Sequence, residues 1–551
     1  MEDKPLIIQS DLSLLLDVHS PGAIAARNAI MAFSELIKSP EHLHTYMITP
    51  LSLWNAASAG ISTEEVLSRL HTYSRYDIPQ TVIFHINEIT ERFGAITLEQ
   101  YSDEDHYLVR FHNDRIEKEV VTRPAYAKML SRCPRGFLLE KYLRGDFKVQ
   151  LIKIGYPVDD RVPLIKGEPI SAEFRKTSVQ GVDLVLRDYQ KEAADSLLGD
   201  GSPGTGYGTI VLPCGSGKTV VGMEILRRVK TRTLILTTNV AAVHQWIAEL
   251  NDKLILPPDS VGEYSGMRKE IRDITVCTYQ ILTWRSDKLA DFPHMKAIRD
   301  HNWGLIIFDE VHMLPAPVFK ITAEMQSVYR VGLTATLIRE DRREDEVFSL
   351  VGPKRYDVPW SELEAGGWIA EAECIEIRVP LPRQKEIEYA IAQKREKYRI
   401  ASENERKIDI VKQLIENHRE DFILVIGQYL NQLKKIAKEL DAPIITGATA
   451  ESKRDELYQA FREGKQRILV VSKVANFAID LPDASVAIQV SGTFGSRQEE
   501  AQRLGRILRP KERSSHFYSI VTRFSSEEEF AVNRQKFLSE QGYRYRSEVW
   551  E

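Results

Sequence analysis

The sequence predicts an α/β fold in which two tandem parallel-sheet domains follow smaller α+β domains. Beyond residue 180, short apolar runs rich in β-branched residues alternate with helical stretches. Such alternation is typical of βαβ units that build a parallel sheet covered by helices. The chain has 551 residues. Because this length is too great for a single hydrophobic core, we expect several domains.

The apolar runs form two series. The first series comprises TIVLP, TLILTT, DITVCT, LIIFDE and VGLTAT, and the second comprises CIEIRV, FILVIG, PIITG, RILVVS, VAIQVS and FYSIV. We assign them to domains at residues 179–366 and 367–551, joined near Gly366-Gly367. The piece GDGSPGTGYG at 199–208 is interpreted as a loop, because no strand precedes its glycines as a dinucleotide-binding motif requires.

Two smaller domains are predicted at residues 1–98 and 99–178. In the first, Pro50 opens one helix, Ser62 caps a second, and apolar residues at helical spacing from 81 to 93 indicate a third. This arrangement resembles a winged-helix unit, with a protein-docking module as the alternative. In the second, Tyr107–Phe111 and Lys148–Ile154 are predicted strands of an α+β domain.

The charge of the whole chain does not decide its partner. Lys and Arg total 74 and Asp and Glu total 79, a net charge of -5, whereas nucleic-acid binding usually accompanies surplus positive charge. A balance over the whole chain, however, does not describe a channel in which local cations hold phosphates. The four cysteines are scattered, which excludes a cysteine-ligated metal cluster and fits a reducing cytoplasm. No apolar run approaches a membrane span, so we expect a cytoplasmic protein.

A glycine-rich loop between a predicted strand and a predicted helix indicates phosphate binding. The loop reads Pro213-Cys-Gly-Ser-Gly-Lys-Thr219. The backbone N–H groups that can surround phosphates belong to Gly215, Ser216 and Gly217. Lys218 can reach the β- and γ-phosphates, and the Thr219 hydroxyl can ligate Mg²⁺. The match is partial, because the strict pattern has a glycine where Leu212 stands.

A strand that ends in two carboxylates complements this loop. The run Leu305-Ile-Ile-Phe-Asp-Glu310 can deliver Asp309 to a bound Mg²⁺, while Glu310 can orient and deprotonate the attacking water. The two motifs together predict hydrolysis of a nucleoside triphosphate.

The second series ends in Gln502-Arg-Leu-Gly-Arg506-Ile-Leu-Arg509. On a helix Gln502, Arg506 and Arg509 share one face, and two guanidiniums aimed at a γ-phosphate would stabilise transition-state charge. Hydrolysis would then require the two domains to close, as in a motor. A surface salt-bridge face is the alternative.

Taken in order, these motifs resemble the superfamily 2 helicases, and within them the XPB family. The motifs are Leu186-Arg-Asp-Tyr-Gln190, the GSGKT loop, Thr237-Thr238, Thr278-Tyr-Gln280, Asp309-Glu-Val-His312, Gly332-Leu-Thr-Ala-Thr336, Arg339-Glu-Asp341 and QRLGRILR. The DEVH sequence and the RED triplet at Arg339–Asp341 narrow the resemblance to XPB, the helicase subunit of the transcription and repair factor TFIIH. It implies RecA-like domains and a DNA-dependent ATPase with 3′-to-5′ polarity that uses ATP and Mg²⁺ in repair or transcription-linked DNA opening.

The resemblance also implies roles for particular residues. Gln190 would contact adenine with support from Arg187, and Gln502, Arg506 and Arg509 would be the finger residues. Residues implied to bind DNA or to couple hydrolysis to it are Thr237, Thr278, Thr334, Thr336, Arg339, Glu340 and Asp341. Residues 99–178 occupy the place of the family's damage-recognition domain, and 385–407 that of a thumb-like insertion, although a plain surface helix fits the latter equally.

Three hypotheses follow. The first is an XPB-like helicase, expected to be a monomer that acts on single-stranded, forked or duplex DNA. The second is an RNA remodeller that shares the ATP site. The third is a double-strand translocase or an ATPase scaffold that recruits a nuclease or a repair or transcription protein without processive unwinding.

Overall fold

The computed structural model describes residues 4–38, 42–103, 105–164, 166–213, 215–286, 292–313, 325, 327–335, 347, 350–358, 360–368, 372–472, 484–492, 515–532 and 544–550. The chain divides into two compact units. One comprises Met1–Leu212 and Gly217–Asp357, and the other comprises Pro213–Ser216 and Val358–Glu551. In the described part of the chain, no helix combines the length and apolarity needed to cross a lipid bilayer.

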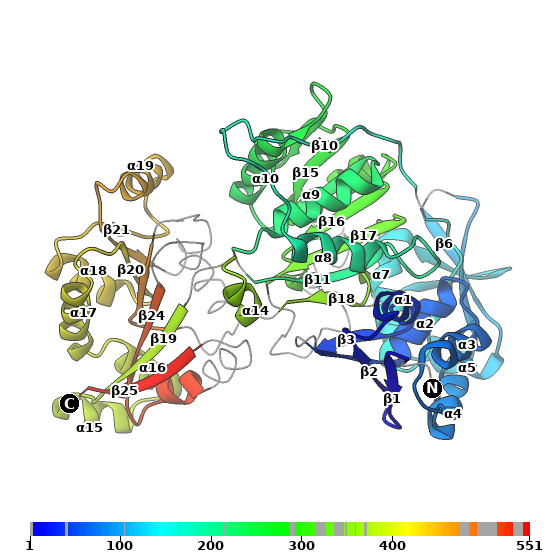
Figure 1. Ribbon diagram of the computed structural model, residues 1–551, viewed down its shortest axis with the longest axis horizontal. Coiled ribbons are helices and arrows are strands. Elements are labelled where there is room, and N and C mark those ends of the chain that lie inside the picture. Colours follow the sequence, from blue (N-terminus) through cyan, green and yellow to red (C-terminus); the bar gives the residue numbers. More distant parts are fainter. Residues whose placement is uncertain are drawn as a thin grey trace. The chain divides into compact units, whose positions relative to one another are not determined.

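A seven-stranded sheet follows the N-terminal domains in the first unit (Figure 1). Its strands, in spatial order, are β14 (Val261–Tyr264), β15 (Ile274–Thr278), β12 (Thr233–Thr237), β16 (Leu305–Asp309), β17 (Tyr329–Thr334), β11 (Tyr207–Val211) and β18 (Lys354–Asp357). All described pairings between them are parallel. Strands β12 and β15 are buried at every position, which explains why their sequences consist of apolar residues and threonine without any charge. The carboxyl ends of these strands meet at one edge, where a nucleotide site of this fold class is expected.

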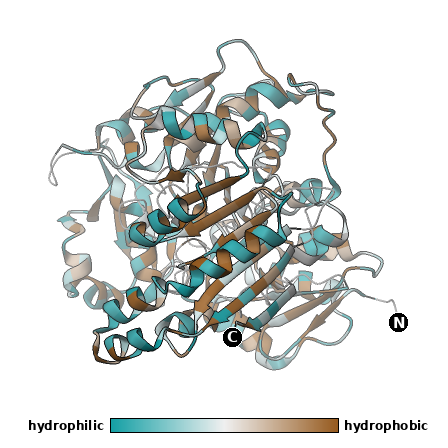
Figure 2. Cartoon of the chain, turned by 90° about the vertical axis from the view of Figure 1, so that its left-hand side faces the viewer, coloured by the Kyte–Doolittle hydropathy of each residue, from teal (hydrophilic) through white to brown (hydrophobic). Residues whose placement is uncertain are grey.

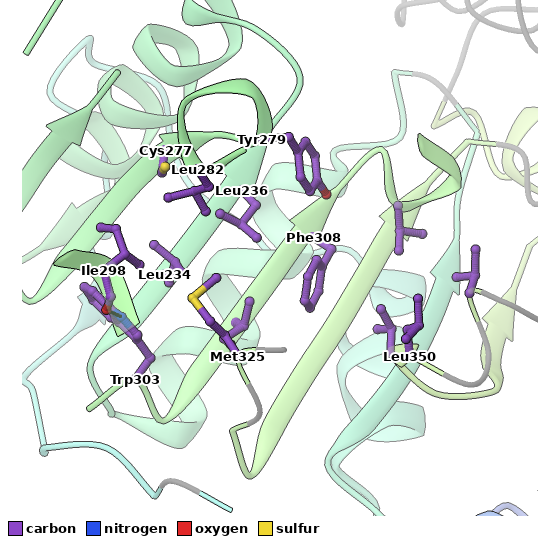
Figure 3. Packing of buried hydrophobic residues seen from close by; sticks show 14 of the residues in the cluster. Leu234, Leu236, Cys277, Tyr279, Leu282, Ile298, Trp303, Phe308, Met325 and Leu350 are labelled. Atoms are coloured by element: carbon purple, nitrogen blue, oxygen red, sulfur yellow. Dashed lines mark hydrogen bonds between the residues drawn. The ribbon is translucent and has the colours of Figure 1, made fainter. Parts of the chain in front are cut away.

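Helices cover this sheet. They are α8 (Asp188–Leu198), α9 (Lys218–Val229), α10 (Val240–Lys253), α11 (Tyr279–Leu282) and α12 (Pro293–Arg299). Gly222 lets α9 and α10 approach closely, because a Cβ atom there would lie 2.8 Å from the Trp246 ring. Figure 3 shows the buried cluster on one side of the sheet, with Phe308, Leu236 and Met325 among its members. Leu51 and Val149, from the N-terminal domains, belong to the same cluster.

The N-terminal domain contains a four-stranded antiparallel sheet. Its strands, in spatial order, are β1 (Leu6–Ile8), β2 (Ser13–Asp17), β4 (Leu43–Met47) and β3 (Glu35–Lys38), and its helices are α1 (Ala23–Ile30), α2 (Pro50–Ser58), α3 (Thr63–Tyr73) and α4 (Gln80–Thr90). The predicted helix starts are confirmed. Thr49 caps α2, which begins at Pro50, because its side chain accepts a hydrogen bond from the Ser52 amide. Ser62 caps α3 in the same way and accepts a hydrogen bond from the Glu65 amide.

A five-stranded sheet follows. Its strands, in spatial order, are β7 (Leu130–Cys133), β8 (Gly136–Glu140), β6 (His106–Phe111), β5 (Ile96–Gln100) and β9 (Val158–Asp160), with helices α5 (Asp114–Val121), α6 (Pro124–Ala127) and α7 (Arg144–Lys153). The prediction of a strand at Lys148–Ile154 is wrong, because α7 runs to Lys153 and Ile154 caps its carboxyl end. Phe147 and Leu151 of α7 pack in this domain's core, whereas Val149 packs against the core of the parallel sheet. A helix buried on two sides carries apolar residues on both faces, and this pattern imitates the alternation of a strand.

The second unit contains another seven-stranded sheet, and its described pairings are also all parallel. Its strands, in spatial order, are β21 (Ile444–Ile445), β22 (Ile468–Ser472), β20 (Ile423–Gly427), β23 (Val486–Gln489), β24 (Ser515–Thr522), β19 (Ala372–Val379) and β25 (Arg544–Val549). Its helices are α14 (Trp360–Ala365), α15 (Arg383–Ile391), α16 (Lys394–Ser402), α17 (Arg406–Asn417), α18 (Leu430–Glu439) and α19 (Glu451–Arg462). Figure 2 shows hydrophobic strands beside helices that carry both hydrophilic and hydrophobic residues. The predicted fold class, two parallel-sheet domains after α+β domains, is confirmed.

A buried ion pair joins two parts of this unit. The Lys407 ammonium lies 2.8 and 2.9 Å from the two carboxylate oxygens of Glu527, and both side chains are almost completely buried. Lys407 also donates to the Val490 carbonyl, and Glu527 accepts from the Thr522 amide. These additional hydrogen bonds compensate for the removal of both charges from water.

Candidate nucleotide site

The glycine-rich loop connects the carboxyl end of β11 to the first turn of α9. Gly215 and Gly217 have φ angles of +82° and +83°, a left-handed conformation that glycine adopts without strain. The Ser216 hydroxyl is turned inward and donates to the Pro213 carbonyl at 2.6 Å. Helix α9 starts at Lys218, so Thr219 lies in its first turn, where free backbone N–H groups and the helix dipole favour an anion.

The start of α8 lies against this loop. Gln190 is almost completely buried, and its side-chain carbonyl accepts a hydrogen bond from the Arg187 amide at 3.1 Å. The Arg187 guanidinium donates to the Tyr189 hydroxyl at 3.0 Å. A Cβ atom on Gly217 would lie 2.7 Å from the Gln190 amide nitrogen. The structure thus brings Gln190, which sequence reasoning assigned to adenine, beside the phosphate loop.

Asp309 ends the buried strand β16, and three hydrogen bonds fix its carboxylate and its backbone carbonyl. Its carboxylate accepts hydrogen bonds from the Trp246 indole at 2.9 Å and from the Glu310 amide at 3.1 Å. Its carbonyl accepts one from the Tyr279 hydroxyl at 3.0 Å. Burial and the neighbouring Glu310 charge raise the pKa of Asp309 to about 6, although Trp246 and the Lys218 ammonium act in the opposite direction. Asp309 and the lysine of the loop both lie at the carboxyl edge of this sheet, because β16 ends at Asp309 and α9 begins at Lys218 after β11.

Glu310 has an unusual backbone. Its φ angle is +52°, in the left-handed region that non-glycine residues avoid and that is enriched at functional sites. His312 Nδ1 lies 3.3 Å from a Glu310 carboxylate oxygen and 3.0 Å from the Thr334 hydroxyl. His312 therefore connects the end of β16 to the end of β17. Sequence reasoning singled out Glu310 and Thr334 but missed the bridge between them.

Thr237 and Thr278 hold neighbouring loops at the same edge. Both are buried, and the Thr237 hydroxyl donates to the Cys277 carbonyl at 3.3 Å. The Thr278 hydroxyl caps α11 by accepting from the Ile281 amide at 3.3 Å. The Gln280 amide donates to the Thr238 carbonyl at 2.6 Å and joins the two loops.

Several predicted site residues lie outside the described residues. They are Gln502, Arg506, Arg509, Thr336, Arg339, Glu340 and Asp341. Trp246 and Tyr279 contact Asp309, but sequence reasoning gave Trp246 no role because it lies 63 positions from its partner.

Divalent-cation binding is consistent with the donors present. Within the described ranges, no three His, Cys, Asp or Glu side chains form a preassembled metal cluster. Mg²⁺, however, is typically held by one or two protein oxygens together with substrate phosphates and water. Burial and Glu310 disfavour the negative charge of Asp309, and a nearby cation would relieve this penalty.

Family models match three parts of the chain. Residues 363–549 match the ERCC3/RAD25/XPB C-terminal helicase model, residues 6–133 match a helicase conserved C-terminal domain, and residues 183–339 match the type III restriction enzyme res subunit.

Relatives extend the match to the whole chain. A Mycobacterium tuberculosis protein named DNA 3′-5′ helicase XPB is 48% identical over 99% of this chain and 98% of its own length. A subunit from Enterocytozoon bieneusi, named general transcription and DNA repair factor IIH helicase/translocase subunit XPB, is 31% identical over 99% of this chain and 93% of its own. The solved structure of the type ISP restriction-modification enzyme LlaBIII bound to DNA shares the fold, with a TM-score of 0.51 and 13% identity over 67% of this chain and 31% of its own.

Proposed function

Because the chain belongs to the XPB family of superfamily 2 helicases, we propose that it is a DNA-dependent ATPase that moves along or unwinds DNA with 3′-to-5′ polarity. The proposed setting is DNA repair or transcription-linked DNA opening. We propose that residues 179–366 and 367–551 are the two helicase domains, and that 1–98 and 99–178 are accessory domains. One observation carries the proposal: the glycine-rich loop that leads into α9 at Lys218 follows β11, and Asp309 ends β16, so both lie at the carboxyl edge of the same parallel sheet.

ATP binding is assigned to the loop and to α8. The amides of Gly215, Ser216 and Gly217 would surround the phosphates, because the two glycines have no side chain there and the serine hydroxyl is turned inward. Lys218 would neutralise the β- and γ-phosphates. Gln190, supported by Arg187, would read the adenine edge. A buried amide hydrogen-bonded to the backbone is well placed to discriminate between bases, since an unsatisfied partner would be costly.

The residues proposed to hold Mg²⁺ are Thr219 and Asp309. When bound, the ion would neutralise charge that develops on the phosphates. Asp309 is ready for this role, because Trp246 and the Glu310 amide fix the orientation of its carboxylate.

Glu310 is proposed to orient the attacking water and to take its proton. Its backbone has a left-handed conformation directly after β16, and His312 lies 3.3 Å from its carboxylate. Because His312 also contacts Thr334, a change at the water-activating group would reach the next strand end. We assign Thr237, Thr278, Thr334 and Thr336 to coupling between hydrolysis and DNA.

The remaining roles concern residues outside the described ranges. Gln502, Arg506 and Arg509 are proposed to stabilise the transition state of phosphoryl transfer. Arg339, Glu340 and Asp341 are proposed to act at the DNA fork. The alternative function is a double-strand translocase, or an ATPase scaffold for a nuclease or a transcription protein, without processive unwinding.

ATP hydrolysis measured alone and with single-stranded, forked or duplex DNA tests the proposal. Lys218→Ala and Glu310→Gln are expected to abolish ATP turnover but to leave DNA affinity within a few-fold. The controls Lys176→Ala and Glu270→Gln, which change exposed residues, are expected to retain ATP turnover. Normal turnover in either site variant would refute the site. Strand displacement on forks of both polarities separates unwinding from translocation, and hydrolysis unaffected by any nucleic acid would contradict the motor.

A further inference from the structure

An aromatic row lies at the carboxyl edge of the first parallel sheet, formed by Tyr264, His294 and Trp284. We call these three residues the aromatic platform. The Tyr264 hydroxyl and His294 Nδ1 are 2.9 Å apart. The His294 ring centroid lies 5.7 Å from the Tyr264 ring and 5.7 Å from the Trp284 ring. The three rings come from the end of β14, the residues after α11 and the start of α12, and they support one another.

The platform is buried at Tyr264 and exposed at Trp284. Tyr264 is 5% exposed, whereas Trp284 is 53% exposed. Burial and Lys269 lower the pKa of His294, which disfavours the charged form of its ring. Trp246 and Trp303, by contrast, are each 2% exposed. A half-exposed indole with a rigid support offers a flat π-face to a ligand, at little cost in side-chain entropy.

One lysine lies over a platform ring, and two arginines are close to the platform in sequence. The Lys269 ammonium lies 5.4 Å from the centre of the Tyr264 ring, and the Arg285 guanidinium lies 5.0 Å from that of Phe292. Arg268 is exposed in the same loop as Lys269. The nearby Glu263 carboxylate is buried and accepts a hydrogen bond from Ser265, so it does not present its charge to the surface. Aromatic faces among Lys and Arg side chains are typical of sites for single-stranded nucleic acid.

The platform is joined to the nucleotide site by one helical turn. Helix α11 begins at Tyr279, whose hydroxyl donates to the Asp309 carbonyl at 3.0 Å. The Trp284 amide donates to the Ile281 carbonyl at 3.2 Å, which fixes Trp284 to the end of this turn. The platform thus lies on the edge that carries Thr278 and Asp309.

We propose that Trp284, supported by His294 and Tyr264, stacks on one base of a single DNA strand, while Arg268, Lys269 and Arg285 hold the neighbouring phosphates. This inference rests on the proposed function, because it requires DNA as the ligand. Every base has a π-face, so the contact does not depend on sequence, which suits a protein that moves along DNA. A protein partner would instead use Trp284 as an apolar anchor and would require no π-face.

The test is binding of labelled oligo(dT), measured by fluorescence anisotropy, to the full chain and its variants. Trp284→Ala and Trp284→Leu are expected to weaken binding about 5- to 100-fold, whereas Trp284→Phe keeps it within about threefold. Lys269→Ala and Arg285→Ala should each reduce the salt slope of binding by about 0.7. Phe84→Ala, which removes a ring that is 66% exposed on α4, is the matched control. ATPase activity without DNA should be unchanged in all of them.

The outcomes separate this inference from the proposed function. If the wild-type chain bound no single strand, the inference would be overturned, and the proposed function would fail as well only if no form of DNA stimulated hydrolysis. If the wild type bound but Trp284→Ala bound equally well, only the inference would be overturned. Retained affinity in Trp284→Leu would also overturn it, because an apolar contact would then suffice.

Discussion

Asp309 should destabilise the free protein at neutral pH, and replacing it by asparagine should reveal by how much. Its folded-state pKa of about 6 lies above the ordinary value of 3.8. The stability of the protonated carboxyl is therefore fully present below about pH 4 and is lost as pH rises through 6. Each pH unit between the two pKa values corresponds to about 1.4 kcal/mol, so the loss of folding stability is at most about 3 kcal/mol. The actual loss is smaller, because the Asp309 side chain keeps some contact with solvent.

The side chain of the Asp309→Asn variant cannot ionise, so the variant avoids this loss. It keeps the acceptor for Trp246 but turns an amide donor toward the Glu310 N–H, at a cost of about 1 kcal/mol. The variant should thus be slightly less stable than wild type at acidic pH and up to about 2 kcal/mol more stable at pH 8. Denaturant unfolding in EDTA, followed by tryptophan fluorescence between about pH 4.5 and 8, measures the difference.

Asp160 provides the opposite case. Burial disfavours its charge, but Lys148 and Arg144 outweigh burial and hold its pKa at about 2. Its contribution is present above about pH 4 and is lost only as pH falls through 2. Asp160→Asn should therefore lose about 3–5 kcal/mol, with little dependence on pH between 5 and 8. If the difference between Asp309→Asn and wild type were equally independent of pH, the raised pKa would be refuted.

Two further substitutions test the phosphate loop and the second unit. Gly217 and Gly181 have φ angles of +83° and +86°, so alanine at either position should lower the stability by a similar amount, about 1–2 kcal/mol. Only the Cβ atom of Gly217→Ala would contact Gln190. Affinity for a fluorescent ATP analogue should fall more than about tenfold in Gly217→Ala alone, and equal affinities would contradict the close approach. Glu527→Gln leaves Lys407 buried without an anion and should lower the unfolding free energy of the second unit by about 3–5 kcal/mol in denaturant titrations. Glu405→Gln, at an exposed pair with Lys435, should cost less than about 1 kcal/mol, and similar losses in the two would disprove the role of burial.

The sequence predicted the parallel sheets well because their strands are buried on both faces. Short runs of apolar and β-branched residues without charges, such as those of β12 and β15, can be recognised without any particular period. Helix α7 was missed because Phe147 and Val149 pack into different cores, a tertiary effect that periodicity does not report. The cap at Ser62 was predicted because it depends only on residues within one turn.

The candidate site divides in the same way. The loop and the Asp309–Glu310 pair are local motifs, so their chemistry was readable from the sequence. Trp246 of α10 contacts Asp309 at the end of β16, and His312 contacts Thr334 at the end of β17, so both contacts join residues that are distant in sequence. The sequence alone contains no local signal for such a pairing, because the sheet order decides which ends are neighbours.

Leu51 and Val149 lie in the same buried cluster as Phe308. A truncated protein that began at residue 179 would uncover that side of the cluster, and each Å² of apolar surface so exposed costs roughly 25 cal/mol. Such a fragment is expected to aggregate or to need detergent, and low activity in it would say little about the accessory domains. A cut between Asp357 and Val358, where the first unit ends, leaves this cluster whole.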